Sequence, residues 1–196
     1  IDDSPVTFNT IEGPYSPQNY TLKFSGPIPM RKALEKSVNV VAIKLNDIVK
    51  PETVVKVAKN LGIKADLKPI LSLPLGANEV TMLELASTYG VFANQGRRVE
   101  PISIIRIEDR DGTSLYEHQI QEKRVYDSNL ISTLVDMMTG IVKFGTGRNA
   151  RLPRPVAGKT GTTSDYKDAW FVGFVPQLVC AAWVGNDNNI PMNNMT

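Results

Sequence analysis

The stretch Gly158-Lys159-Thr160-Gly161 holds residue types that could do chemistry, and two kinds of site contain a lysine in such a setting. One is a phosphate-binding loop, Gly-x-x-x-x-Gly-Lys-Ser/Thr, whose first glycine lets backbone amides curl around phosphates. Here that first position is Pro153, which lacks an amide donor and has a fixed φ. An aromatic strand pattern follows the lysine, where a phosphate loop needs a helix. The sequence therefore argues against a nucleotide loop.

The alternative is one wall of an acyl-transfer site. Lys159-Thr160-Gly161, followed by Thr162 and Thr163, matches the third motif of the set Ser-x-x-Lys, Ser-Asp-Asn and Lys-Thr-Gly. Ser37-Val38-Asn39 matches the second motif, with Val in place of Asp. A strand edge would then present a cation, hydroxyls and amides to one side of a cleft, and a loop between helices would present a hydroxyl and an amide from the other.

Each motif also has a purely structural interpretation. Lys159 could be a solvated strand residue, and Ser37 or Asn39 could cap a helix that starts near Val40. The two motifs occur in the right order, and the strand-like runs of the predicted sheet follow Lys159-Thr160-Gly161. This combination favours the acyl-transfer interpretation.

The elements that must position these residues can be predicted from periodicity and from residues typical of helix ends. We expect helices on both sides of a break at 37–39, a helix from Pro51 to near Gly62, one from a Thr81–Glu84 capping box to near Gly96, and one from Asp127 to Gly145. A hairpin is expected at 101–117, strands at 156–162, 169–175 and 178–185, and irregular chain at 1–28. Helices first and strands last predict an α+β fold, an antiparallel sheet flanked by helices.

Composition limits the remaining function classes. The 196 residues carry a net charge of +2 and suit one domain, with no basic field for nucleic acid or an anionic membrane. The lone Cys180 lies in an apolar run, is expected to be buried, and can form neither an internal disulfide nor a Cys-based metal site. The one histidine, His118, falls in the hairpin region, away from a Ser-His-Asp arrangement. Trp170 and Trp183 are expected in the core, with Trp183 a candidate for lining the cleft. Nothing requires a metal or a cofactor.

Longer stretches carry a resemblance to a known family. "YSPQNY" and "FSGPIPMRKALEKSVNVVAIKL" resemble the surroundings of the second motif in class A penicillin-binding proteins, the bifunctional peptidoglycan synthases. "LGANEVTMLELASTYGVFANQGRRVEP" resembles their central helical segment, and "GTGRNARLPRPVAGKTGTTSDYKDAWFVGFVPQLVCAAWVG" their most recognisable block. The likeness extends to about Asp187. It implies a fold like that of penicillin-binding proteins and serine β-lactamases.

One part of the family pattern is missing. The family's nucleophile lies in a Ser-x-x-Lys segment before the second motif, and no serine before Ser37 has a lysine three residues later. The match at Ser164–Lys167 comes after Lys159-Thr160-Gly161 and is interpreted as a loop between strands. We therefore expect residues 1–196 to be a fragment of a transpeptidase domain. This fragment begins after the nucleophile and should be inactive alone.

The resemblance implies a serine D-Ala-D-Ala transpeptidase that cross-links peptidoglycan stem peptides and is acylated by β-lactam antibiotics. It implies that Ser37 relays a proton to the leaving group, that Asn39 orients the substrate amide and the nucleophile's lysine, and that Lys159 supplies positive charge. Thr160 and Thr162 would bind the substrate carboxylate, with Gly161 and Thr163 in the same binding stretch. The amide of Thr162 would share the oxyanion hole with the serine. The parent protein would be anchored on the extracytoplasmic side of a bacterial membrane, with an upstream glycosyltransferase domain.

Two alternatives remain open. A serine β-lactamase shares the motif set but must hydrolyse its acyl-enzyme quickly, and no convincing acidic loop for that step is visible. An interaction domain could retain the fold without the chemistry. Intact Ser37, Asn39, Lys159 and Thr162 argue against such decay.

Overall fold

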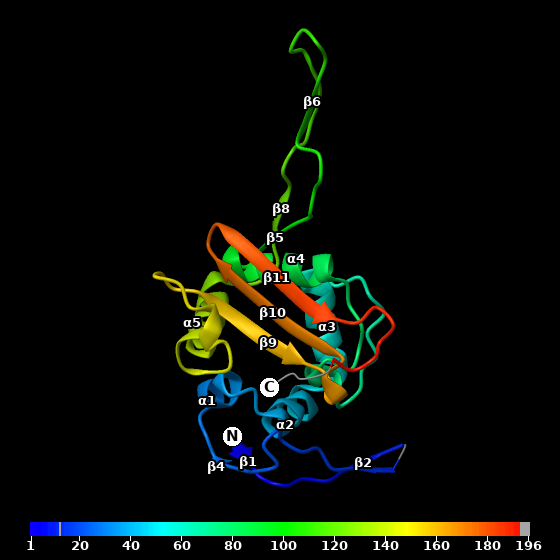
Figure 1. Cartoon of the computed structure of the whole chain (residues 1–196), viewed down its shortest axis with the longest axis vertical. Helices are drawn as coiled ribbons and strands as arrows, with labels where there is room; N and C mark the ends of the chain where they lie inside the picture. Colours follow the sequence, from blue (N-terminus) through cyan, green and yellow to red (C-terminus); the bar gives the residue numbers. More distant parts are fainter. Residues whose placement is uncertain (12, 193–196) are drawn as a thin grey trace.

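The computed structural model describes residues 1–11 and 13–192. A three-stranded antiparallel sheet of order β11-β10-β9 lies at its centre, with helices packed against it (Figure 1). The helices are α1 Met30–Glu35, α2 Asn39–Val49, α3 Pro51–Leu61, α4 Met82–Ala93 and α5 Ser128–Phe144, with 3₁₀ turns η1 Leu73–Leu75, η2 Arg148–Ala150 and η3 Ser164–Tyr166. The long strands are β9 Ala157–Thr162, β10 Asp168–Val175 and β11 Leu178–Gly185. This arrangement confirms the predicted α+β class.

Local chemistry fixes most helix ends where the sequence predicts them. Thr81 Oγ1 accepts from the amide of Glu84 at 3.2 Å, and Glu84 Oε2 accepts from the amide of Thr81 at 3.0 Å, so α4 begins with the expected capping box. Asp127 caps α5 by accepting from two amides of its first turn. Pro51 occupies the first turn of α3, and Gly62 ends it with a φ of +115°.

The central sheet is a meander. Pro176-Gln177 links β10 to β11, and residues 163–167 link β9 to β10. Lys159 lies opposite Val172 on β10, and Val172 lies opposite Ala181 on β11. Because paired residues share a face, the set Ala157, Lys159, Val172 and Phe174 points to one side of the sheet. That side carries α4 and α5.

The core lies between this face and the two helices. Met138 and Ile141 of α5 pack on Ala157 and Phe174, and all four are buried. Tyr89 of α4 meets the ring of Phe174 edge-on, with centroids 6.2 Å apart. Burial raises the pKa of Tyr89 to about 12, so its phenol stays neutral at physiological pH.

The burial predicted for Cys180 is wrong, because its side chain is exposed. Strand β11 is apolar on both faces, so its sequence does not reveal which face is covered. Val179, Ala181 and Trp183 are half-buried on the helix side, whereas Leu178 and Cys180 lie among the exposed residues of the other side.

The first 28 residues are mostly irregular, as predicted, but they contain two short antiparallel pairs. The strands are β1 Asp2–Asp3 with β4 Gly26–Pro27, and β2 Phe8–Thr10 with β3 Gly13–Tyr15. This segment runs beneath α1 and α2 in the view of Figure 1. It therefore lies at the end of the molecule that carries the predicted Ser-x-Asn motif.

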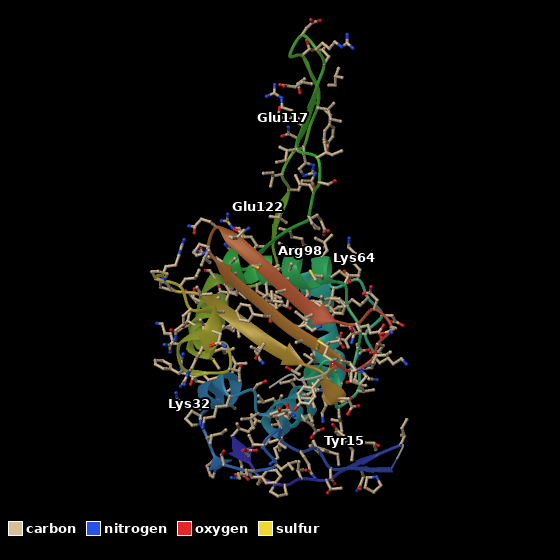
Figure 2. All side chains as sticks on the ribbon, viewed as in Figure 1. Tyr15, Lys32, Lys64, Arg98, Glu117 and Glu122 are labelled. Atoms are coloured by element: carbon tan, nitrogen blue, oxygen red, sulfur yellow. The ribbon has the colours of Figure 1, made fainter. Side chains whose placement is uncertain are left out.

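The expected hairpin forms an arm that projects from the body (Figure 1). Its base pairs β5 Arg97–Val99 with β8 Glu122–Arg124, and its tip pairs β6 Arg106–Glu108 with β7 Ser114–Glu117. Figure 2 shows Glu117 and Glu122 on this arm, and Lys32 and Tyr15 at the opposite end of the molecule. His118 is half-buried in the arm, where Nδ1 lies 3.2 Å from Tyr116 Oη.

Candidate active site

The predicted Ser-x-Asn motif forms the turn between α1 and α2. Ser37 adopts a left-handed backbone with a φ of +55°, which is uncommon for a residue with a side chain. The turn is held by backbone bonds, since Ser37 N donates to Leu34 O at 3.1 Å and Val38 N to Ala33 O at 2.9 Å. Ser37 and Asn39 are half-buried. Backbone bonding thus fixes the turn that carries the Ser37 side chain.

Lys159 of β9 meets this turn. Its Nζ donates to Ser37 Oγ at 2.8 Å and to the carbonyl oxygen of Thr160 at 2.8 Å. Burial lowers the pKa of Lys159 from 10.5 to about 8, because a desolvated ammonium is disfavoured. The solvated-lysine alternative is therefore wrong, and the two predicted motifs lie in direct contact.

Strand β9 is an edge strand of the central sheet in the described part of the chain. Its unpaired edge lies beside the Lys159–Ser37 contact and forms part of the candidate site. Thr163 N donates inward to Asp168 O at 3.1 Å. Since backbone groups alternate along a strand, the N–H of Thr162 points to the open edge instead. The carbonyl of Thr160, which accepts from Lys159, points to this edge as well. The edge therefore offers an amide donor next to the ammonium.

The side chains of Thr160 and Thr162 lie on the sheet face opposite Lys159. Thr160 Oγ1 is 2.6 Å from Thr146 Oγ1, whereas Gly161 and Thr162 are exposed. The Thr163 hydroxyl bonds both the backbone amide and the carboxylate of Asp168, at 2.8 and 3.2 Å. Thr163 therefore closes the β9–β10 connection, and Thr160 and Thr162 remain near the open edge.

The helix-capping alternative for Ser37 and Asn39 is wrong. Helix α2 begins at Asn39, and its N-cap, Val38, makes no side-chain bond. The amide of Val40 instead donates to Asn19 Oδ1 at 3.1 Å, and Asn39 Nδ2 donates to Gln18 O at 3.2 Å. The N-terminal segment, rather than the motif itself, thus serves the start of α2.

Three residues that the sequence interpretation missed make hydrogen bonds around the two motifs. Asn19 supplies the bond to α2. Thr146 links Thr160 to α1, since its amide donates to Glu35 O at 3.2 Å. Glu35 is 3% exposed, and its carboxylate accepts from Lys32 Nζ at 2.6 Å. No sequence signal indicates these three residues, because helical spacing places Glu35 beside Arg31 and Lys32 on the charged side of its helix.

The Ser164–Lys167 match lies in the β9–β10 connection, which confirms its interpretation as a loop between strands. Tyr166 Oη in this connection lies 2.7 Å from Tyr20 Oη, in an exposed contact with the N-terminal segment. Trp183 donates to Asp168 Oδ1 at 2.8 Å, and its ring lies 6.4 Å from that of Trp170. Both indoles are half-buried on the helix side of the sheet.

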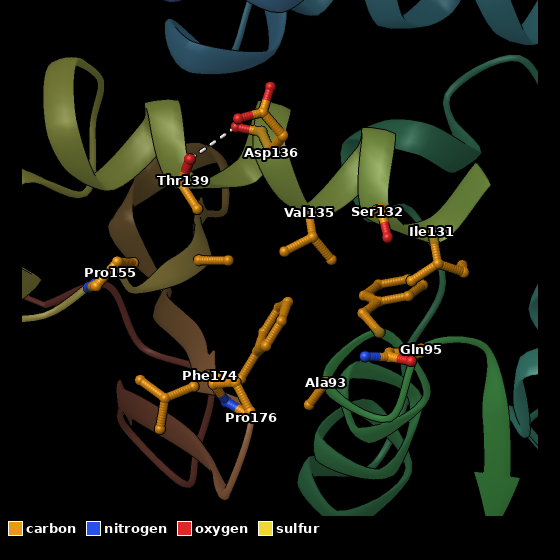
Figure 3. A pocket seen from close by; sticks show the side chains of 13 residues that line it. Ala93, Gln95, Ile131, Ser132, Val135, Asp136, Thr139, Pro155, Phe174 and Pro176 are labelled. Atoms are coloured by element: carbon orange, nitrogen blue, oxygen red, sulfur yellow. Dashed lines mark hydrogen bonds between the residues drawn. The ribbon is translucent and has the colours of Figure 1, made fainter. Parts of the chain in front are cut away.

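A cavity of about 330 Å³ lies elsewhere, between α4, α5 and the far ends of β9 and β10 (Figure 3). Val135, Phe174 and Pro176 line it with other mainly apolar side chains, and none of the predicted site residues does.

Within residues 1–11 and 13–192, no group of three or more His, Cys, Asp or Glu side chains is placed to hold a metal ion. No helix of the described chain is long and apolar enough to cross a membrane.

Comparison with known proteins gives the class to which this fold and these motifs belong. Residues 2–189 match the penicillin-binding protein transpeptidase domain, and the chain belongs to that family. It is 45% identical over 172 residues to penicillin-binding protein 1A of Aquifex aeolicus, covering 87% of this chain and 24% of that protein. It is 37% identical over 191 residues to penicillin-binding protein 2D of Bacillus subtilis, covering 92% and 27%. The chain thus spans about a quarter of the length of these curated relatives.

Solved structures show the same fold. Penicillin-binding protein 1A from Haemophilus influenzae superposes with a TM-score of 0.92 at 24% identity, covering 99% of this chain and 36% of that one. The PonA1 protein of Mycobacterium tuberculosis in complex with penicillin V gives a TM-score of 0.86 at 24% identity, covering 98% and 56%. These likenesses confirm the fold that the sequence predicted.

Proposed function

We propose that this chain forms part of a serine D,D-transpeptidase that cross-links peptidoglycan stem peptides, and that Ser37, Asn39, Lys159 and Thr162 act in its catalytic site. The observation that carries the proposal is the 2.8 Å bond from Lys159 Nζ to Ser37 Oγ. Family membership supplies the transpeptidase class, and the contact supplies residues with the acid–base chemistry that this reaction needs.

The nucleophile in this proposal is the serine of a Ser-x-x-Lys segment that faces the Ser37 turn and is not among these residues. Its oxygen attacks the carbonyl carbon between the two D-alanines, and a serine ester forms as the peptide bond breaks. The departing D-alanine amine takes a proton through the Ser37 hydroxyl. An amine of a second stem peptide then attacks the ester, a new amide forms, and the serine regains its proton.

The remaining residues of the site bind and orient. The exposed N–H of Thr162 and the amide of the nucleophilic serine hold the developing oxyanion, a task for which one lost donor costs about 100- to 1000-fold in rate. Thr160 and Thr162 bind the substrate carboxylate at the open edge of β9, in the stretch that also contains Gly161 and Thr163. Asn39 orients the substrate amide. A β-lactam carries a similar carboxylate and acylates the same serine.

The whole protein that we propose is anchored on the extracytoplasmic side of a bacterial membrane and carries a glycosyltransferase domain. The coverage of about a quarter of the relatives' length leaves ample chain for both parts. The substrates are stem peptides and the inhibitors are β-lactams. The penicillin V complex of the structurally similar PonA1 protein supports the inhibitor class.

Acylation of the intact protein by penicillin tests this function. Intact-mass spectrometry should find one penicilloyl adduct on a serine of a Ser-x-x-Lys segment, with slow release. Ser37→Ala should slow its formation by about 100-fold or more. Ser132→Ala, at an exposed serine of α5, should leave the rate unchanged.

Two outcomes would contradict the proposal. Rapid release of hydrolysed penicillin would indicate a β-lactamase-like hydrolase. Neither adduct nor hydrolysis would indicate an interaction domain.

A further inference from the structure

Asn19 lies outside both motifs, yet its buried side chain holds the start of α2. Its side chain is among the buried polar groups, at 6% exposure. Nδ2 donates to Asp3 Oδ1 at 2.8 Å and to Lys23 O at 2.9 Å, while Oδ1 accepts from Val40 N at 3.1 Å. Every strong donor and acceptor of this amide is therefore engaged.

Asp3 completes the connection from the other side. It is 1% exposed, and its second oxygen accepts from Ser25 N at 2.9 Å. The pairing of β1 with β4 holds Asp3 in place, opposite Gly26. A buried carboxylate with fixed donors is a rigid anchor, because leaving any of these groups unpaired is unfavourable. The irregular segment before α1 is thus fixed to the first turn of α2.

This anchor acts on the candidate site through adjacent residues. Val40 follows Asn39 directly, and the neighbour of Asn19, Gln18, accepts the side-chain amide of Asn39 at 3.2 Å. Two contacts, one from the buried Asn19 and one from the exposed Gln18, therefore set the backbone and the side chain at the end of the Ser37–Asn39 turn. Small displacements matter there, since a shift of about 1 Å in a catalytic group can slow a reaction about 100-fold.

We propose that Asn19 is a positioning residue for the acyl-transfer site: it holds the Ser37–Asn39 turn at the distance from Lys159 that proton transfer needs. This inference rests on the proposed function and extends it to a residue that touches no substrate.

The same helix offers a matched control. Asn46 of α2 is also buried, at 2% exposure, and its Nδ2 donates to Ile70 O and Leu71 O at 3.0 and 3.1 Å. Asn46 therefore donates two side-chain bonds as Asn19 does, whereas its Oδ1 is buried without a hydrogen-bond partner. It ties α2 to the chain before η1 rather than to the site. Loss of either amide should lower the melting temperature, whereas only loss of the Asn19 amide should disturb Ser37.

The test compares the intact parent protein with Asn19→Ala and Asn46→Ala, using a fluorescent penicillin in stopped flow. Varying the penicillin concentration gives the first-order acylation rate constant at saturation and, separately, the penicillin dissociation constant. Circular dichroism gives the folded fraction of each variant, for which both values are corrected. We expect Asn19→Ala to lower the rate constant about 10- to 100-fold with little change in the dissociation constant. Asn46→Ala should keep the parental rate constant.

A second pair of variants covers the case in which Asn19→Ala does not fold. Asn19→Asp places a second carboxylate against that of Asp3. Adding Asp3→Asn removes this repulsion, because the amide at position 3 can donate to the carboxylate at position 19. That carboxylate can still accept from Val40 N, although the bond to Lys23 O stays lost, so the double variant should recover part of the rate that Asn19→Asp loses.

The possible outcomes separate the two proposals. Equal rate constants in Asn19→Ala and Asn46→Ala, or no recovery in the double variant, would overturn the role of Asn19 and leave the proposed function standing. A parent that forms no adduct would overturn the proposed function and this inference together.

Discussion

Lys159 Nζ and Ser37 Oγ lie 2.8 Å apart although 122 positions separate the residues in the chain. The lysine reaches the serine from a sheet edge, and the serine reaches the lysine from a turn between two helices. A second bond to the carbonyl of Thr160 holds the ammonium against its own strand. Two elements that meet only through tertiary packing therefore create the contact on which the proposed chemistry depends.

The pH dependence of acylation should report the lowered pKa of Lys159. Burial brings this pKa to about 8, so the ammonium is lost as pH rises through that value rather than near 10.5. If the positive charge is what the site uses, the second-order acylation rate constant for penicillin should fall with a midpoint near pH 8. Lys159→Arg stays protonated across this range and should remove that descent.

Rates measured from pH 6 to 10 check this prediction. A rate constant that rises through pH 8 in the parent would instead make the neutral amine the active form. It would contradict the charge role assigned to Lys159.

Gly145 should tolerate no larger residue, because its backbone packs directly against the backbone at the end of α1. A Cβ there would meet the backbone carbonyl of Glu35 in the segment that leads to Ser37. Gly145→Ala should therefore destabilise the fold by about 1–3 kcal/mol through overpacking and also slow acylation. Gly90→Ala is the matched control, since a Cβ on this residue of α4 would meet nothing within 4 Å.

Calorimetry of the intact protein measures both effects. Gly90→Ala should stabilise the domain by up to about 1 kcal/mol, because alanine loses less backbone entropy than glycine in a helix. Equal melting temperatures for Gly145→Ala and the parent would show that α1 is free to move.

Glu84 should stabilise the fold at neutral pH and cease to do so in acid. Hydrogen bonds that its carboxylate accepts from the backbone N–H groups of Thr81, Lys64 and Ala65 lower its pKa from 4.5 to about 2. The bond from Thr81 is the largest cause. Since the folded pKa lies below the unfolded one, this stabilisation is present above about pH 4.5 and lost as pH falls towards 2.

Glu84→Gln provides the comparison for this effect. The parent should melt at a higher temperature than the variant at pH 7, and the gap should narrow steadily as pH falls from 4.5 to 2.5. A gap that stays constant over this range would show that the bonds to the carboxylate do not act through its charge.

Much of the fold could be predicted because its signals are local. The Thr81–Glu84 capping box, Pro51 and Gly62 act within one helical turn, and the break at Ser37 shows as an interruption of helical periodicity. The antiparallel strands follow from two apolar runs and a two-residue link. Each of these features depends on neighbours in sequence, so the sequence alone reveals it.

The remaining features depend on contacts between distant segments. Nothing near Asn19 indicates that its Oδ1 accepts from the backbone N–H of Val40, because residues 1–28 have little periodicity from which their path could be predicted. The bond from Thr146 to Thr160 depends in the same way on how α5 meets β9. Cys180 was misplaced because β11 is apolar on both faces, and only packing decides which face is covered.

The most direct test of the central claim is a double-mutant cycle between Ser37 and Lys159, measured as the penicillin acylation rate constant of the intact protein. If the two side chains act as one unit, Ser37→Ala and Lys159→Ala together should slow acylation little more than the slower single variant. Ser37→Ala combined with Lys143→Ala, at an exposed lysine of α5, should lose no more than Ser37→Ala alone. A Ser37–Lys159 double variant whose loss equals the product of the two single losses would contradict the account.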